Sequence, residues 1–338
     1  MKASMSDFDL YMNDYQTAWR SEYLANQEEG SQLQKKHSWV LPRELWEEGL
    51  WSGIRNGHNS LPAYLIKEKV QKHDGVHNLK SSWMQCANLY FPFREDREIL
   101  ASFLQKYISP LIKTIDKVEL EWAEDSPMLS PTALLGEPQG QRGKNQTSPD
   151  IAFIVNDGKG IVLTENKFTE HSFYTCSGYK KAYGNPDSQR CLELDKLYGD
   201  TTNRCYMFQW AKGKRTNRNY WNYLKLTEKG IATLKSCPAA TAGYQLFRQQ
   251  ALAEALAQKG PYELVVSCVA YDARNITLVE CLKNTGIDNF TTGWGSLFEG
   301  KVSFTTFTHQ QWVQWVREND YNNRHTDWLT YVHRRYGF

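Results

Sequence analysis

The sequence has no hydrophobic run long enough to cross a membrane. A membrane-spanning helix needs about 18 apolar residues in a row, and no stretch approaches this length. The first residues also lack the apolar core of a signal peptide. We therefore expect a cytoplasmic protein with no membrane partner.

A strong excess of charge and a disulfide framework are also missing. Lys and Arg number 40 against 38 Asp and Glu, which gives a net charge of +2. Overall charge therefore indicates neither a nucleic acid nor a membrane surface, and any electrostatic site must be local. The 7 cysteines are odd in number and scattered, which is typical of a reducing compartment.

Aromatic and hydrophobic side chains are what the chain has in quantity. Hydrophobic residues make up 41% of the 338 residues and aromatic residues 13%. This composition is that of a folded globular protein, and the length suffices for one large α/β domain with elaborations. Because repeats and Pro/Gly/Ser-rich linkers are absent from the sequence, we expect one continuous globule.

The hydrophobic periodicity predicts helices alternating with strands. Residues 1–75 have helical patterns, notably at 43–50 and 63–72, each directly preceded by a proline. The other expected elements, in chain order, are a helix at 94–109, a strand at 117–122, a hairpin at 150–155 and 161–167, a helix at 244–258, strands at 262–271 and 301–307, and helices at 308–318 and 327–335. This order predicts an α/β/α layered domain, with residues 1–78 as a helical extension packed on it.

The predicted hairpin carries two carboxylates and a cation at one end. Asp150 begins the first strand and Glu165 lies near the end of the second, so antiparallel pairing brings them together. Glu165 and Lys167 point to the same face, whereas Asn166 points away. Two carboxylates can hold a divalent cation that activates water for phosphodiester hydrolysis, and the Lys167 ammonium can hold that water. The alternative is structural, with Asp150 in a turn and a solvated ion pair at the strand end.

These residues resemble the signature of a known superfamily. Ser148-Pro149-Asp150, followed after the hairpin by Glu165-Asn166-Lys167, is similar to the motif of the PD-(D/E)XK nucleases. Further segments resemble an uncharacterised bacterial branch of it: Ser81–Leu89, Glu121 with Ser126-Pro127, Lys167–Glu170 and Tyr244–Leu246. The match extends over roughly residues 79–317.

The resemblance implies a restriction-endonuclease-like fold, a three-layer α/β/α core with a mixed central sheet. It implies that Asp150 and Glu165 hold Mg²⁺ or Mn²⁺ and that Lys167 stands at the water. It also implies a nucleic-acid substrate, with DNA favoured over RNA and an endonuclease favoured. The nuclease domain would span residues 79–338, with 168–230 as an insertion or a nucleic-acid-binding segment.

A third acidic residue often completes such sites. We favour Glu121, which ends the strand before the hairpin, over Glu137 and Glu98, although each also fits a surface carboxylate. His73 and His77 have the spacing of a metal-binding pair on a helix, but the glycine between them breaks such a helix. The sequence therefore predicts no histidine ligand.

A basic stretch follows the hairpin. Residues 201–227 contain cations interleaved with aromatic residues and no acid. Cations can follow a phosphate backbone while aromatics stack on bases, but a core strand with a solvated basic loop explains the same residues. The candidate contacts are Lys212, Lys214, Arg215 and Arg218, joined by Gln245 and Arg248, which are equally ordinary residues of a helix surface.

Four cysteines resemble another feature of the superfamily. Some of its nucleases hold an iron–sulfur cluster with one upstream and three downstream cysteines, and Cys86, Cys176, Cys191 and Cys205 have that order. The close pair usual in such clusters is missing, so we favour buried apolar cysteines.

Three functions remain open from the sequence. The favoured one is a hydrolytic, Mg²⁺-dependent nuclease, and a homodimer would suit cleavage of two strands with one site in each chain. The second is a nucleic-acid-binding protein with the same fold and no cleavage. The third is a scaffold or another phosphate chemistry on that fold. The intact set of Asp150, Glu165 and Lys167 favours the first.

Overall fold

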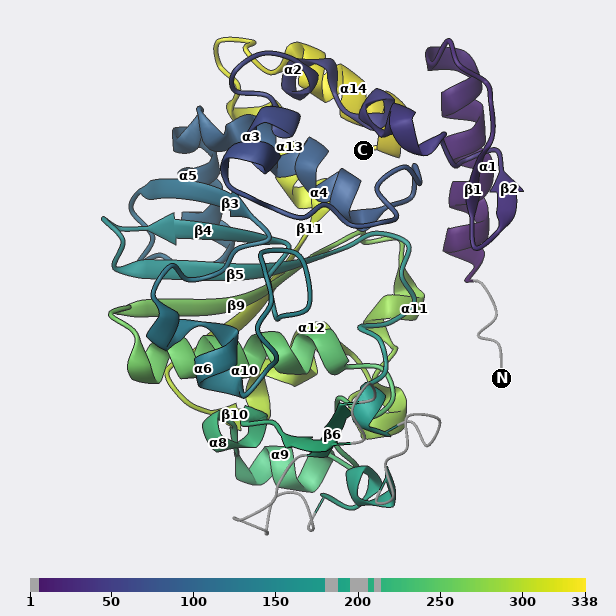
Figure 1. The fold of residues 1–338 in the computed structure, drawn as a ribbon. Helices are drawn as coiled ribbons and strands as arrows, with labels where there is room; N and C mark the ends of the chain where they lie inside the picture. Colours follow the sequence, from purple (N-terminus) through teal and green to yellow (C-terminus); the bar gives the residue numbers. More distant parts are fainter. Residues whose placement is uncertain (1–5, 180–187, 195–205, 210–213) are drawn as a thin grey trace.

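A five-stranded mixed sheet forms the centre of the protein (Figure 1). The computed structural model describes residues 6–179, 188–194, 206–209 and 214–338. The strands lie in the order β11-β9-β5-β4-β3. Their bounds, in that order, are Ser303–Thr308, Leu264–Tyr271, Gly160–Lys167, Ile151–Val155 and Ile115–Leu120. β11, β9 and β5 are parallel neighbours, whereas β5, β4 and β3 are antiparallel neighbours.

The predicted hairpin is confirmed as β4 and β5. Its turn has left-handed backbone at residues 156–158, with φ of 57°, 57° and 76°. These residues are Asn, Asp and Gly, the types that adopt this conformation with least strain. The register pairs Ile151 with Thr164. Asp150 and Glu165 are therefore the next pair toward the end of the hairpin.

One face of the sheet is covered by helices from both ends of the chain. They share a hydrophobic core with inward residues such as Phe153 and Val162. The main helices on this face are α4 (Ser82–Tyr90), α5 (Arg97–Tyr107), α13 (His309–Asn319) and α14 (Thr326–Tyr336). α13 begins with the predicted Thr308 cap, which forms a capping box with Gln311.

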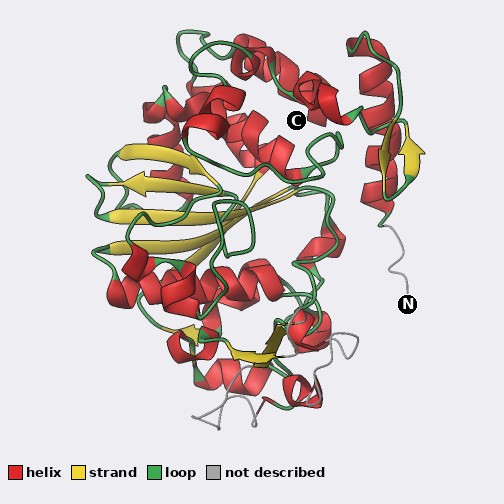
Figure 2. Cartoon of the chain, viewed as in Figure 1, coloured by secondary structure: helices red, strands yellow, loops and turns green. Residues whose placement is uncertain are grey.

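The opposite face packs against α10 (Tyr244–Lys259) and shorter helices. Ile161 and Leu163 of β5 belong to this second core, whereas Val162 belongs to the first. The shorter helices include α6 (Pro131–Leu135), α8 (Tyr220–Tyr223), α9 (Glu228–Thr233) and α12 (Phe290–Gly293). Figure 2 shows the three layers, with helices on both sides of the sheet. The predicted three-layer α/β/α fold is confirmed.

The N-terminal region contains helices and one small hairpin. α1 (Asp7–Tyr23) packs against α14, where Gln16 Nε2 donates to Arg335 O (2.9 Å). The region continues with β1 (Gly30–Gln32), β2 (Lys35–His37), a 3-10 helix at Arg43–Gly49, α2 (Ser52–Arg55) and α3 (Leu61–Lys67). The expectation of helices throughout residues 1–75 is therefore wrong at 30–37. A strand pairing there satisfies the backbone in place of a helix.

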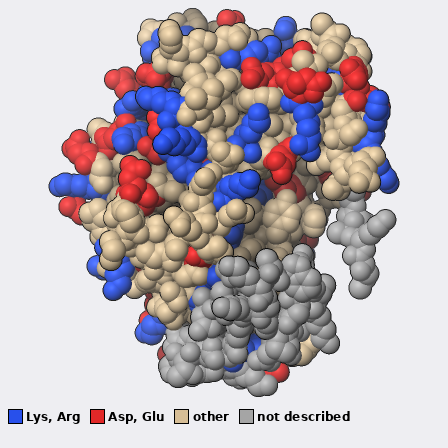
Figure 3. All heavy atoms as spheres, viewed as in Figure 1, with Lys and Arg blue, Asp and Glu red and all other residues tan. Residues whose placement is uncertain are grey.

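Further short elements are β6 (Tyr206–Gln209), β7 (Lys214–Asn217), β8 (Lys225–Leu226), α11 (Ile276–Val279) and β10 (Phe298–Glu299). β8, α11 and β10 contribute Leu226, Leu278 and Phe298 to the second core. None of the described helices combines the length and hydrophobicity that crossing a membrane requires. On the face shown in Figure 3, acidic and basic side chains are interspersed, as the small net charge suggests.

Candidate active site

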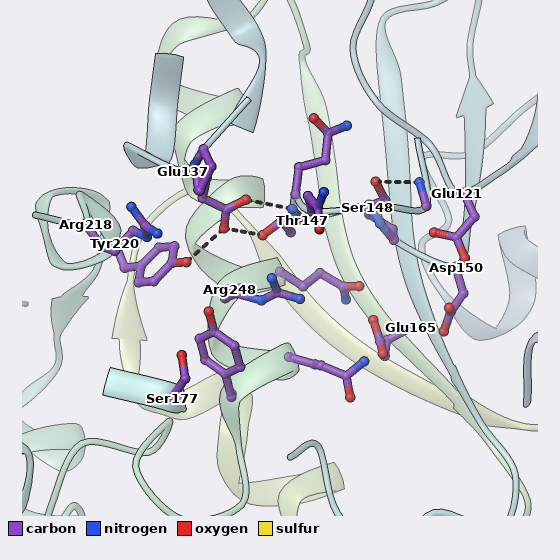
Figure 4. Close-up of a pocket in the computed structure, with 18 of the residues that line it drawn as sticks. Glu121, Glu137, Thr147, Ser148, Asp150, Glu165, Ser177, Arg218, Tyr220 and Arg248 are labelled. Carbon is purple, nitrogen blue, oxygen red and sulfur yellow. Dashed lines mark hydrogen bonds between the residues drawn. The ribbon is translucent and has the colours of Figure 1, made fainter. Parts of the chain in front are cut away.

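Three carboxylates line up across neighbouring strand ends. Glu121 follows β3, Asp150 precedes β4 and Glu165 lies in β5. The Glu121 amide donates to the Asp150 carbonyl oxygen (3.0 Å), and the strand register places Asp150 opposite Glu165. Their exposed fractions are 2%, 6% and 5%, so the row is buried. We call Glu121, Asp150 and Glu165 the acidic row (Figure 4).

Glu121 reaches this row through an unusual backbone conformation. Its φ of 48° lies in the left-handed region, which strains any residue with a side chain. His73 Nε2 lies 2.9 Å from Glu121 Oε1. One potential ligand atom from each of His73, Glu121 and Asp150 lies within 4.8 Å of the other two. The third acid favoured from sequence is thus brought to the hairpin, together with a histidine.

His73 was not predicted as a ligand from the sequence. Its only expected role was as the helical partner of His77, and His77 instead donates from Nε2 to Ser31 O (3.2 Å). His73 lies between α3 and α4, outside any helix, and approaches the acidic row from there. No local spacing signals this contact, because only the folded chain brings that loop to the end of β3.

Lys167 lies on the same face of β5 as Glu165. Its Nζ donates to Glu165 Oε1 (2.7 Å), and only 2% of Lys167 is exposed. Burial lowers the pKa of Lys167, but the carboxylates of Glu165, Glu170 and Asp150 outweigh it and raise the pKa above the usual value. The ammonium is therefore kept charged beside the acids.

Asn166 points to the opposite face, as the alternation of a strand predicts. Its side-chain Nδ2 donates to Ser82 O (2.9 Å) and to Gln85 Oε1 (3.3 Å), both on α4. Its backbone amide donates to Asp150 Oδ2 (2.7 Å). The residue between the two catalytic candidates thus anchors the strand to α4 and orients the Asp150 carboxylate.

Burial disfavours the charged forms of Asp150 and Glu121 in the acidic row. Burial and the charge of Glu165 raise the pKa of Asp150 well above its usual range, and burial raises the pKa of Glu121. Burial lowers the pKa of His73, yet its hydrogen bond with Glu121 and the charges of Glu121, Asp150 and Glu165 together outweigh this effect and raise the pKa to about 9. Carboxylate oxygens suit Mg²⁺ and Mn²⁺, and imidazole is a common metal ligand. The donor set therefore fits a divalent cation, which would bind His73 as the neutral imidazole after release of its proton.

The acidic row forms one end of a pocket of about 510 Å³. Tyr244, Gln245, Arg248 and Gln249 of α10 also line it. Figure 4 shows Arg248 between the acidic row and a second group at the far end of the pocket. That second group consists of Glu137, Arg218 and Tyr220.

Half of the residues predicted to bind nucleic acid line this pocket. Arg218, Gln245 and Arg248 do so, although they are far apart in sequence. Lys212 lies outside the described residues, and so do the side chains of Lys214 and Arg215, which belong to β7.

The two competitors of Glu121 lie elsewhere. Glu137 lines the pocket but accepts hydrogen bonds from Thr147 N (2.6 Å), Thr147 Oγ1 (2.6 Å) and the Tyr220 hydroxyl (2.8 Å). These donors hold Glu137 away from the acidic row. Glu98 is an exposed residue of α5 that lines a separate pocket. Of the three, the structure brings only Glu121 to Asp150.

The described cysteines do not form the arrangement expected of an iron–sulfur site. Cys86 lies in the core on the α4 face, whereas Cys176 and Cys191 belong to the core on the α10 face. Cys205 lies outside the described residues. The sheet separates the upstream cysteine from the two described downstream ones, so these three do not share a cluster. Burial as apolar side chains accounts for Cys86 and Cys176.

Comparison with known protein families gives one match over nearly the whole chain. The profile described as "Restriction Endonuclease associating with ARP" (REase-ARP) matches residues 12–337. Neither the curated proteins nor the solved structures contain a significant match to the chain. The matched region includes His73, the acidic row, Lys167 and the α10 side of the pocket. The chain therefore belongs to the family of restriction endonucleases associating with ARP.

Proposed function

We propose that the protein is a metal-dependent PD-(D/E)XK nuclease that hydrolyses phosphodiester bonds, with DNA favoured as substrate. The observation that carries the proposal is the convergence of the acidic row at adjoining strand ends beside the buried Lys167 ammonium. The acidic row lines a pocket that Arg218 and Arg248 also line. Membership of a restriction-endonuclease family supports the same chemistry.

Each residue has a role that its position supports. Asp150 and Glu165, which the strand register places opposite each other, would hold Mg²⁺ or Mn²⁺. Glu121 and His73, which cluster with Asp150, would be further ligands. A bound divalent cation supplies charge neutralisation at the scissile phosphate and lowers the pKa of a water molecule. Lys167 keeps Glu165 in place and offers N–H donors to the attacking water or to phosphate oxygens.

Nucleic-acid binding without cleavage is the second candidate function. Arg218 and Arg248 support it, because guanidinium groups bind phosphate through paired N–H donors. An intact acidic row favours cleavage over binding alone, because buried carboxylates repel phosphate unless a cation lies between them.

We also propose two partners. The description of the family names ARP as an associate, so we expect this chain to copurify with ARP when the two are coexpressed. A homodimer would place two sites on one substrate. Molar mass by light scattering, with and without nucleic acid, tests that arrangement, and a monomer in both conditions would contradict it.

Cleavage assays test the proposed activity. Linear and circular duplex DNA, single-stranded DNA and RNA are incubated with the protein and Mg²⁺, Mn²⁺ or EDTA. We expect cleavage with a divalent cation and none with EDTA. Glu165→Gln and Lys167→Met should each lower the cleavage rate by about 10²-fold or more, because they remove a metal ligand and the neighbouring donor.

Lys159→Met is the matched control for Lys167→Met. Lys159 lies on the same hairpin and pairs with Glu263 (3.6 Å) at the exposed surface. Its substitution removes the same charge outside the pocket and should leave the rate unchanged. Cleavage that survives in Glu165→Gln and Lys167→Met would overturn the assignment. Binding without cleavage in every condition would favour the second candidate function.

A further inference from the structure

The α10 side of the pocket contains an acceptor that no described residue pairs. Gln249 is only 1% exposed, and its Nε2 donates to Cys268 O (2.9 Å) and Ser267 Oγ (3.2 Å). The Cys268 carbonyl oxygen can only accept a hydrogen bond, so the Gln249 side-chain atom that faces it must be the amide nitrogen. The other side-chain atom is therefore the amide oxygen, Oε1. Gln249 Oε1 is buried and lacks a hydrogen-bond partner in the described part of the chain. A ligand with an N–H group would satisfy it.

A guanidinium group over an aromatic ring also lines the α10 side of the pocket. The Arg248 guanidinium lies over the Tyr244 ring, with Cζ 4.6 Å from the ring centroid. Arg248 Nε and Gln245 Oε1 are also buried without a partner among the described residues. Unstacked nucleobases stack on tyrosine rings and on guanidinium planes, and their edges offer both donors and acceptors. This part of α10 therefore has the chemistry that recognises a base.

The dimensions of the pocket restrict how a nucleic acid can enter. A volume of about 510 Å³ is typical of small-molecule sites. The carboxylates at its end are at most 6% exposed, so a phosphate must reach them from within the pocket. Enzymes that hold a single base in a pocket take the nucleotide out of the stack and place aromatic side chains against the base.

We infer that this pocket takes a single unstacked nucleotide, so that the substrate is a single strand or a locally unpaired one. The base lies on the surface formed by Arg248 and Tyr244, and its phosphate reaches the acidic row. The buried acceptor of Gln249 pairs with a donor on the base edge. The inference rests on the proposed function, because it assigns the substrate class of the same site.

Binding and cleavage of matched strands test this inference. An oligonucleotide of about 12 nucleotides is prepared as single-stranded DNA, as single-stranded RNA and as duplex DNA. Fluorescence anisotropy with Ca²⁺ measures affinity, and cleavage rates are measured with Mg²⁺ and Mn²⁺. We expect one of the single strands to bind at least about tenfold more tightly than the duplex and to be cleaved faster.

Substitutions on α10 separate this surface from general binding. Tyr244→Leu removes the ring and should weaken single-strand binding about tenfold, and Arg248→Lys should weaken it several-fold while keeping the charge. Tyr223→Leu is the matched control, because Tyr223 is also half-buried at the edge of the same core but lies outside this pocket. It should bind as the unmodified protein does.

The outcomes distinguish the inference from the proposed function. A single-strand preference that falls with Tyr244→Leu and Arg248→Lys, but not with Tyr223→Leu, supports the inference. Duplex cleavage at least as fast as single-strand cleavage, with the same rate in Tyr244→Leu, overturns the inference and leaves the proposed function intact. No cleavage of any substrate with either metal overturns the proposed function and the inference with it.

Discussion

The two faces of β5 near its end meet different surroundings. Toward α4, the Asn166 side chain donates to Ser82 and Gln85 within a packed layer. Toward α10, Lys167 Nζ donates to Glu165 Oε1, and Glu165 lines the pocket. Consecutive residues of one strand therefore serve the fold on one face and chemistry on the other.

The difference between the faces is also one of free energy. On the α4 face, Asn166 forms hydrogen bonds that stabilise the folded chain. On the α10 face, Asp150 and Glu165 are buried side by side, and burial together with the charge of Glu165 raises the pKa of Asp150. Residues kept for a ligand commonly reduce stability in this way. Substitution on the two faces should therefore have opposite effects on stability and activity.

The largest effect is expected for Asp150→Asn on the pocket face. Cleavage should fall by about 10³-fold, because a proposed metal ligand loses its charge. Without metal, the free energy of unfolding should rise by about 1 kcal/mol, because a buried like charge is removed while an oxygen remains to accept from the Asn166 amide. Cleavage rates and urea denaturation in EDTA measure the two effects.

Asp157→Asn serves as the control for that substitution. Asp157 lies in the turn of the same hairpin with φ of 57°, which Asn also adopts readily. Activity and stability should both stay unchanged. A clear loss of stability in Asp150→Asn would show that Asp150 supports the fold, and the contrast between the two faces would fail.

The second effect concerns His309, which holds the end of β5 from the packed side. His309 is fully buried, and its ring bonds to Lys167 O (3.0 Å) and the Tyr90 hydroxyl (2.9 Å). Burial lowers its pKa from 6.5 to about 4. Between pH 6.5 and about 4, His309 binds a proton in the unfolded chain but not in the folded chain. Stability is therefore complete above pH 6.5 and falls with pH down to about 4, by about 3 kcal/mol.

Urea denaturation across this pH window measures the His309 contribution. His309→Gln should have a lower free energy of unfolding at neutral pH and a shallower dependence on pH, because the titrating ring is absent. Other groups contribute equally to both proteins, so the difference between the slopes isolates His309. Identical slopes would contradict a neutral, buried imidazole in the folded protein.

The smallest effect is expected for Asn166→Ala on the packed face. The substitution removes two side-chain hydrogen bonds to α4 but keeps the backbone amide that donates to Asp150. The free energy of unfolding should fall by about 2 kcal/mol, and the cleavage rate of the folded protein should change less than about threefold. A rate loss as large as that of Asp150→Asn would show that the packed face of β5 also contributes to cleavage, which contradicts the division of roles between the two faces.

Residues close along the chain were the predictable part of the site. Asp150, Glu165 and Lys167 share one hairpin, so strand pairing and the two-residue period decide their relation. Glu121 was within reach of the same reasoning because its strand leads toward the hairpin. The contact of His73 with Glu121 could not be predicted in this way. The choice of Glu121 over Glu137 and Glu98 could be tested only from the positions of these residues in the folded chain.

The sequence by itself determined the hairpin, the facing of its side chains, the cap at Thr308 and the order along the chain of the five strands of the central sheet with their main helices. These features depend on contacts between residues near in sequence, whose geometry the backbone imposes. Only the tertiary structure brought His73 to Glu121 and placed Arg248 between the acidic row and the Glu137 group. Such contacts depend on how the layers pack. The side chains that meet there come from helices, strands and loops far apart in the sequence, so no regular spacing along the chain relates them.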